Sequence, residues 1–134
     1  MMAKEYLNQG FRINERIDSK IEQIGMLRTL AAKTSTTLSD MPGDPNKGKS
    51  RTEEMVVKIL SLEEEINKDI DRLVDLKQEI MRVIDKVEDP QESLLLNLRY
   101  LNFFRWEDIA ITMDCSVRNV HKIHSRALEH VKVS

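Results

Sequence analysis

The sequence contains few of the residues that mark secreted, fibrous or sheet-rich proteins. It has one cysteine, four glycines, three prolines and 4% aromatic residues among its 134 positions. The single thiol, Cys115, cannot form an internal disulfide, which excludes a disulfide-stabilised scaffold and favours a reducing compartment. The low glycine and proline content excludes a collagen-like chain. Because 33% of the residues are charged, the composition predicts an all-α protein with long surface helices.

Long hydrophobic runs are also absent. The apolar stretches are only a few residues long, whereas a membrane span needs about 20. The first residues, Met1 to Glu5, lack the apolar segment of a signal peptide. We therefore expect a cytoplasmic protein with no membrane partner.

Charge is divided unevenly along the chain, although the net charge is only −2. Residues 51–89 hold seven Lys or Arg against twelve Asp or Glu, whereas residues 115–134 hold four Lys or Arg against the single acid Glu129. The C-terminal segment therefore has the sign that nucleic acid attracts, and the acidic middle is expected to point away from phosphate.

Two long helices are predicted in the first two thirds of the chain. Apolar residues recur every three or four positions over residues 4–33, ending where the run 34–37 is expected to fray the helix. The composition of residues 41–48 predicts a loop, and the form of residues 50–53 predicts a capping box with Ser50 as N-cap. Over residues 51–88 a heptad of apolar residues predicts a coiled-coil seam. The seam is expected to contain Ile59, Leu62, Ile66, Leu73, Leu76, Ile80, Val83 and Val87 from the second helix, and Ile13, Ile17, Ile24, Leu27 and Ala31 from the first.

In each of the two helices a charged residue interrupts the apolar series that forms the seam, and the two interruptions fall at corresponding positions. An antiparallel hairpin makes neighbours of residues whose numbers sum to about 91, so Lys20 falls opposite Asp69 and Asp71. We predict that these charges meet and set the register of the hairpin; the alternative is that they are unrelated solvated side chains.

A third helix should begin at Asp89, a helix-capping residue followed by Pro90. Its expected apolar face contains Leu94, Leu95, Leu98 and Leu101. The predicted domains are therefore a coiled-coil hairpin over residues 1–89, with its loop at about 41–50, and a small helical domain over residues 90–134.

Residues 106–125 read as two short helices joined by a tight turn at residues 113–116. Apolar residues at Ile109, Val120 and Ile123 suit two helices that cross around a small core, and Ser116 supplies an N-cap for the second helix. This is the pattern of a helix-turn-helix, whose second helix normally lies in the DNA major groove. Cys115 in the turn and Val117 directly after it are expected to be buried.

Residues 98–110 and 116–128 resemble region four of bacterial sigma factors, the module that reads the promoter −35 element. From about Leu62 onward the chain also resembles small phage and prophage proteins of Gram-positive bacteria, of the autolysin-regulator and late-activator types. Asp114 stands where that pattern usually has glycine, and aspartate tolerates the left-handed conformation better than most residues. The resemblance implies a transcription regulator of late gene expression that contacts RNA polymerase.

The predicted DNA-binding residues lie on or beside the second helix of this pair. Arg118 and Lys122 stand one turn apart where base edges are reached, and either can donate to guanine. Asn119 can bind adenine or a phosphate, and the sigma resemblance adds His121. The expected phosphate contacts are Arg105, Ser116, Ser125 and Arg126. His124 should turn toward the core. The alternative is a solvated basic face on a protein-binding domain.

Two further motifs are weighed and rejected. Residues 43–50 spell G-x-x-x-x-G-K-S, but no buried strand precedes them and two prolines remove amide donors, so we interpret the segment as a flexible basic turn. Cys115, His121 and His124 lack the further ligands of a zinc site. No catalytic arrangement stands out, so we expect a non-enzyme without cofactor or metal.

The sequence therefore predicts a double-stranded-DNA-binding regulator that forms a homodimer or higher homo-oligomer through its coiled coil. Doubling the recognition helix would multiply the affinity for DNA. A DNA-packaging component like a small terminase subunit is the main alternative, although its DNA-binding part usually comes first in the chain. A protein-interaction module is the third possibility.

Overall fold

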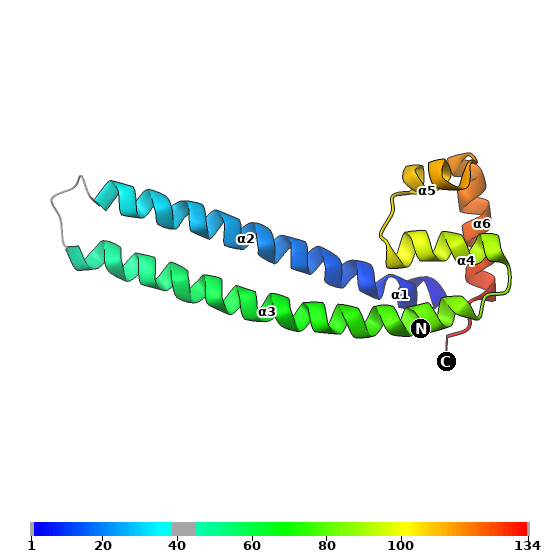
Figure 1. Cartoon of the computed structure of the whole chain (residues 1–134), viewed down its shortest axis with the longest axis horizontal. Coiled ribbons are helices and arrows are strands. Elements are labelled where there is room, and N and C mark those ends of the chain that lie inside the picture. Colours follow the sequence, from blue (N-terminus) through cyan, green and yellow to red (C-terminus); the bar gives the residue numbers. More distant parts are fainter. Residues whose placement is uncertain (1, 39–44, 134) are drawn as a thin grey trace. The chain divides into compact units, whose positions relative to one another are not determined.

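The described residues of this computed structural model are helical apart from short connections and form no strand, which confirms the predicted all-α class. The structure describes the backbone of residues 2–38 and 45–133 and the side chains of residues 2–33 and 50–133. The helices in chain order are α1 (Ala3–Leu7), α2 (Gln9–Leu38), α3 (Pro45–Asp85), α4 (Pro90–Leu96), the π-helix η1 (Asn97–Leu101), α5 (Trp106–Met113) and α6 (Val117–His130) (Figure 1). None of the helices in these ranges is long and apolar enough to cross a membrane.

The chain forms two compact units, which are described separately. Unit 1 contains residues 1–14 and 72–134, and unit 2 contains residues 15–71. These units do not follow the predicted boundary at residue 89, because unit 1 includes both α1 and the end of α3. The separation of a hairpin domain from a C-terminal domain stays a prediction.

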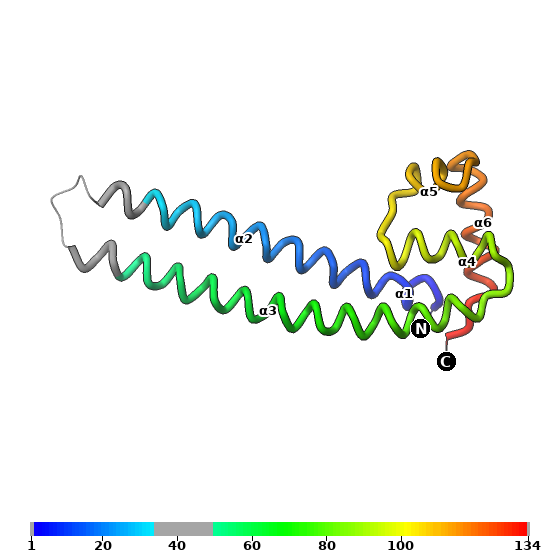
Figure 2. Tube along the Cα trace, in the orientation of Figure 1, coloured from blue at the N-terminus to red at the C-terminus, as the bar shows by residue number. Residues whose placement is uncertain are grey.

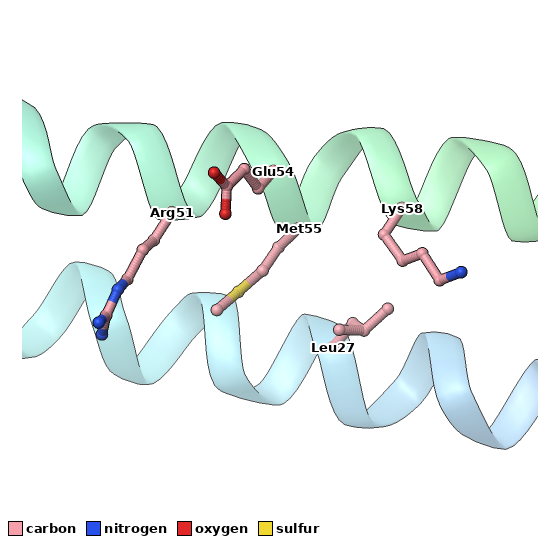
Figure 3. A pocket seen from close by; sticks show the side chains of 5 residues that line it. All are labelled: Leu27, Arg51, Glu54, Met55 and Lys58. Atoms are coloured by element: carbon pink, nitrogen blue, oxygen red, sulfur yellow. The ribbon is translucent and has the colours of Figure 1, made fainter.

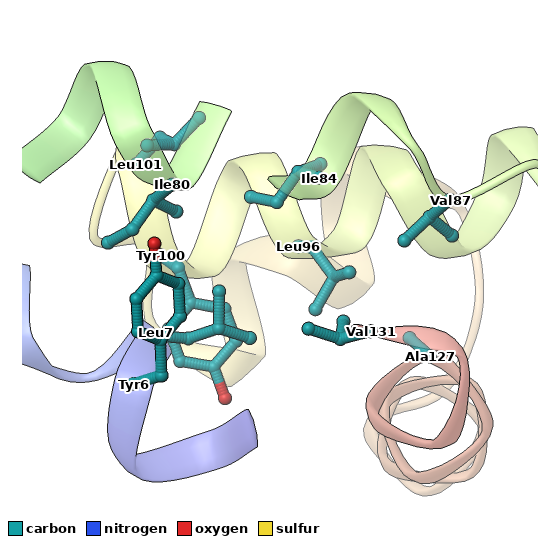
Figure 4. Packing of buried hydrophobic residues seen from close by; sticks show 10 residues of the cluster. All are labelled: Tyr6, Leu7, Ile80, Ile84, Val87, Leu96, Tyr100, Leu101, Ala127 and Val131. Carbon is teal, nitrogen blue, oxygen red and sulfur yellow. The ribbon is translucent and has the colours of Figure 1, made fainter. Parts of the chain in front are cut away.

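Unit 1 is held together by a core to which α1, α3, α4, η1 and α6 contribute. α1, the end of α3, the α4–η1 segment and the end of α6 all place side chains in it (Figure 4). Leu7, Ile80 and Leu96 are fully buried, and Ala127 and Val131 of α6 pack against them. The Tyr6 hydroxyl donates to Glu79 Oε1 at 2.9 Å. This core fixes the C-terminal end of α6, so the orientation of that helix depends on residues from both ends of unit 1.

Unit 2 consists of the adjoining parts of α2 and α3, which run side by side in opposite directions (Figure 2). The predicted seam residues within this unit are buried or half-buried, among them Ile17, Ile24 and Leu62. Toward the far end, Leu27 and Met55 point into the space between the two helices, beside Arg51, Glu54 and Lys58 (Figure 3).

The predicted contact of Lys20 is confirmed for Asp69, whereas Asp71 is exposed. Lys20 Nζ lies 2.7 Å from Asp69 Oδ2, and Arg16 Nη2 lies 3.5 Å from Asp69 Oδ1. Only 8% of the Asp69 side chain is exposed, so the carboxylate occupies the seam itself. Ile21, expected on the buried face, is 53% exposed because Lys20 takes the inward position beside it.

Several predicted helix bounds were wrong. The helix expected over residues 4–33 is divided at Asn8, whose ψ of −8° departs from helical geometry, and α2 continues through residues 34–37 to Leu38. α3 begins at Pro45, so residues 45–50 are helical and Ser50 is no N-cap. Proline is favoured in the first helical turn, which explains the earlier start. The rest of the predicted loop, at residues 41–44, lies outside the described residues.

The segment after Asp89 combines a confirmed cap with an unforeseen π-helix. Asp89 Oδ1 accepts from the amides of Gln91 at 2.8 Å and Glu92 at 3.2 Å, as an N-cap should. The amide of Asn102 then donates to the Asn97 carbonyl, five residues back. The face that this segment buries consists of Leu95, Leu96, Tyr100 and Leu101, and Leu94, expected to be buried, is 45% exposed.

Candidate nucleic-acid interface

α5 and α6 share a small apolar core with the α4–η1 segment. Its buried members are Leu95, Ile109, Ala110, Val120 and Ile123. Leu98, Phe104, Trp106, Met113 and Cys115 pack against them while partly exposed. Cys115 is therefore only half-buried, against the expectation of burial. Because α6 contributes Val120 and Ile123 to this core and Ala127 to the other, its apolar side is anchored along most of its length.

The connection from α5 to α6 depends on one left-handed residue and one cap, both as predicted. Asp114 has φ 54° and ψ 53°, the left-handed conformation expected where the resembled pattern has glycine. The Ser116 hydroxyl accepts a hydrogen bond from the Asn119 amide at 3.1 Å, which satisfies a free donor of the first turn of α6. These two residues direct α6 away from the end of α5.

The outward side of α6 carries a row of basic side chains. Arg118, Lys122 and Arg126 are four residues apart and therefore lie on one face of the helix, and all three are exposed. Within the described part of the chain, no carboxylate forms an ion pair with any of them. The row is thus positioned to pair with anions from outside the protein.

The remaining predicted contact residues are exposed too, but three of them already have intramolecular partners. Ser125 Oγ donates to the His121 carbonyl at 3.1 Å, and Arg105 Nε donates to Asp108 Oδ2 at 3.3 Å. Ser116 serves as the cap described above, and Asn119 is exposed beside it. An external phosphate would therefore compete with existing bonds at Arg105 and Ser125.

An aromatic cluster lies beside the basic row. The ring of His121 is exposed and lies 4.6 Å from the Trp106 ring, centroid to centroid. The guanidinium of Arg99 lies 4.4 Å from the Trp106 centroid, and its Nη1 donates to the Phe104 carbonyl at 2.9 Å. Trp106, the first residue of α5, therefore contacts both the His121 ring and the Arg99 guanidinium. Val117, expected in the core, is 37% exposed because it is the first residue of α6 and lies beyond the packed part of α5.

His124 turns into the protein, as predicted. Its Nε2 lies 2.6 Å from the Tyr100 hydroxyl, and the residue is 7% exposed. Burial lowers the pKa of His124 to about 4, and the nearby cations Lys4 and Arg99 act in the same direction. Burial raises the pKa of Tyr100 to about 12. Both groups are therefore neutral at pH 7.

A second histidine, His130, fixes the C-terminal end of α6 through a hydrogen bond to Glu92. His130 Nδ1 donates to Glu92 Oε2 at 2.8 Å, and this hydrogen bond raises the pKa of His130 above its usual value. Glu92 is 2% exposed although it carries a carboxylate. Its role was not foreseen, because its position three residues after Asp89 suggested a helix cap.

Sequence reasoning missed Arg99, Trp106 and Tyr100 as neighbours of the basic helix. The available signal was the position of Arg99 and Trp106. This basic residue and this aromatic residue lie on either side of the turn between two predicted helices. The π-helix that brings Arg99 and Tyr100 to their positions has no comparable signature in the sequence. Among the residues that the structure describes, no group of three or more His, Cys, Asp or Glu side chains is placed to hold a metal ion.

Comparison with known proteins identifies a family but adds no relative of known structure. No curated protein and no solved structure shows a significant match to the chain. One family model matches residues 35–132, which include all of α3 and all of the helices that follow it. The chain therefore belongs to the family described as a protein of unknown function, DUF1492.

Proposed function

We propose that the protein is a sequence-specific DNA-binding transcription regulator whose α5 and α6 form a helix-turn-helix. The supporting observation is the exposed row of Arg118, Lys122 and Arg126 on a helix whose opposite side is buried. A rigid helix with unpaired cations and short polar side chains is what the major groove accepts. The resemblance to sigma region four further suggests a phage-encoded regulator of late genes that contacts RNA polymerase.

The individual side chains have separate roles in this proposal. Arg118 and Lys122, in the first two turns of α6, read base edges, and Asn119 binds adenine or an adjacent phosphate. Arg126 and Arg105 bind phosphates on either side, and the Ser116 and Ser125 hydroxyls support them. His121, stacked on Trp106, is held at the edge of this surface.

The helical hairpin has a supporting role in the proposal. One recognition helix makes few phosphate contacts, so the pairing of α2 and α3 into a coiled coil would serve homodimer formation or the polymerase contact. The protein acts as a binding protein and not as an enzyme, in the cytoplasm where its DNA target lies.

The test is binding of the full-length protein to double-stranded DNA from upstream of its own gene, measured by fluorescence anisotropy over a salt series. Arg118→Ala and Lys122→Ala are each expected to weaken binding about tenfold or more at sites that contain guanine. If either side chain binds phosphate instead, the salt slope should decrease by about one. Lys86→Ala is the control, since Lys86 is an exposed cation in the turn directly after α3.

The control variant is expected to bind DNA like the wild type. If no DNA binds at low salt, or if Lys86→Ala weakens binding as much as Arg118→Ala does, the proposal is wrong. A folded protein that binds an acidic protein but no DNA would support the protein-interaction reading.

A further inference from the structure

One flank of unit 2 carries exposed apolar side chains at a regular spacing. Arg28 Nη2 and Glu63 Oε1 are 3.0 Å apart, so α2 and α3 present these two residues on the same flank. Residues seven positions apart share a helix face. Ile21 precedes Arg28 by seven residues, and Val56 and Ile70 lie seven residues before and after Glu63. The exposed fractions of the three apolar residues are 53%, 47% and 42%.

Two more residues belong to this surface, which we call the Ile21 flank. Leu60, three residues before Glu63, is 59% exposed. Gly25, three residues before Arg28, has open space where a Cβ would stand. Glycine inside an exposed helix costs about 1 kcal/mol relative to alanine, and among the described residues no atom lies within 4 Å of a Cβ built at Gly25. A glycine of this kind allows another helix to approach closely.

The flank on the other side of the seam is mainly charged, although Leu30, fourteen residues after Arg16, is 47% exposed there. There Arg16 pairs with Asp69, and Lys20 Nζ lies 3.9 Å from Glu65 Oε2. Val56, Glu63 and Ile70 of α3 are seven residues apart and form a second heptad series, which Leu60 flanks and which the pairing of α2 with α3 leaves partly exposed. A second heptad series of this kind is typical of a helix that packs against two neighbours.

The charges on the Ile21 flank are self-complementary. We infer that this flank binds the same flank of a second copy, with a two-fold axis that runs parallel to the helices. This axis places α2 of one copy against α3 of the other at equal height, so Arg28 meets the partner's Glu63 and Glu63 meets the partner's Arg28. Ile21 then meets the partner's Ile70. An axis perpendicular to the helices and centred on the ion pair would instead oppose two Glu63 carboxylates.

The inference deepens the proposed function, since it names the surface and symmetry of the dimer on which that proposal rests. Residues 15 and 71, through which unit 2 joins unit 1, lie at the same end of the antiparallel pair. A parallel two-fold axis therefore brings residues 15 and 71 of both copies, where the chain continues into unit 1, to the same end of the paired units 2. Two recognition helices can then bind the two halves of a palindromic site.

Molecular mass in solution tests the surface. Analytical ultracentrifugation of the wild type, without DNA, is expected to show a dimer of the 15.6 kDa chain. Leu60→Glu and Ile70→Glu each place an unpaired carboxylate in the interface and are expected to raise the dimer dissociation constant about 100-fold. Met26→Glu is the matched control, because Met26 is 66% exposed and lies on the opposite side of α2 from Arg28. Circular dichroism checks that each variant remains helical.

Cysteine cross-linking tests the symmetry. In a Cys115→Ser background, an Ile21→Cys protein is mixed with an Ile70→Cys protein and oxidised. A disulfide-linked pair is expected in the mixture and not in either protein alone, because each cysteine faces the other position in the partner.

Three results would overturn the inference: a monomeric wild type, equal dissociation by Met26→Glu, or a dimer that forms no mixed disulfide. None of these measurements contains DNA. A failure here therefore leaves the Arg118 and Lys122 experiment standing, and a failure of that experiment leaves the dimer standing.

Discussion

At the scale of single residues, His124 makes stability depend on pH. Its pKa is lowered from 6.5 to about 4 in the folded protein, so between these values the unfolded chain binds a proton that the native state does not. The stabilising contribution is complete above pH 6.5 and is lost as pH falls through about 4. The shift sets an upper limit of about 3 kcal/mol on this loss. His130 acts in the opposite sense, because its raised pKa contributes stability at low pH that is lost as pH rises.

We expect His124→Gln to remove this part of the pH dependence. Glutamine keeps a polar partner for the Tyr100 hydroxyl but does not titrate. Free energies of unfolding from urea titrations at pH 7.5 and pH 4.5 should differ less in the variant than in the wild type, by up to about 3 kcal/mol. His130→Gln serves as control and should change the pH slope in the other direction. An unchanged slope in His124→Gln would show that His124 titrates normally.

At the scale of helices, the ion pair inside unit 2 is expected to restrict the partners of α2 more than it stabilises the fold. Lys20→Met removes the 2.7 Å contact to the Asp69 carboxylate, of which 8% is exposed, and should lower the free energy of unfolding by about 2 kcal/mol. Replacing both residues with leucine should return the stability to within about 1 kcal/mol of the wild type, since apolar residues can replace buried ion pairs.

Lys68→Met provides the comparison for that experiment. Lys68 pairs with Glu64 at 3.7 Å, but both side chains are more than 70% exposed. Its loss should therefore change the free energy of unfolding by less than about 0.5 kcal/mol. The measurement is urea unfolding of the wild type, Lys20→Met, the double leucine variant and Lys68→Met. If Lys20→Met is as mild as Lys68→Met, the buried pair has no special role and the proposed register function loses its support.

The helices could be predicted largely where one local rule dominates. Apolar periodicity located α3, α5 and α6, and side-chain capping located the starts of α4 at Asp89 and of α6 at Ser116. Prediction failed where tertiary packing overrides the local pattern. The π-helix at residues 97–101, which buries Tyr100, has no local sequence rule. The buried Glu92 is hydrogen-bonded to His130, which is 38 residues away in sequence.

The exposure of the candidate contact residues was easier to predict than the core that holds them. All eight predicted contact residues are exposed, because cations on the polar side of an amphipathic helix remain in solvent in almost any packing. The Trp106 contacts of His121 and Arg99 depend instead on how three segments meet in space. Periodicity within a single helix carries no information about such contacts.

At the scale of the whole molecule, the acidic and basic segments should act independently on DNA. Residues 51–89 have a surplus of acids, whereas α6 carries the exposed basic row. If the acidic segment points away from the duplex, its charges are screened from phosphate, since the Debye length is about 8 Å at physiological salt. Glu53→Gln, Glu54→Gln and Asp71→Asn combined should therefore leave the DNA dissociation constant within about twofold of the wild type. Anisotropy measurements at 0.15 M and 0.05 M salt check this. A large gain in affinity that grows as salt is removed would mean that these carboxylates lie against the duplex, and DNA would then have to contact the hairpin as well as α6.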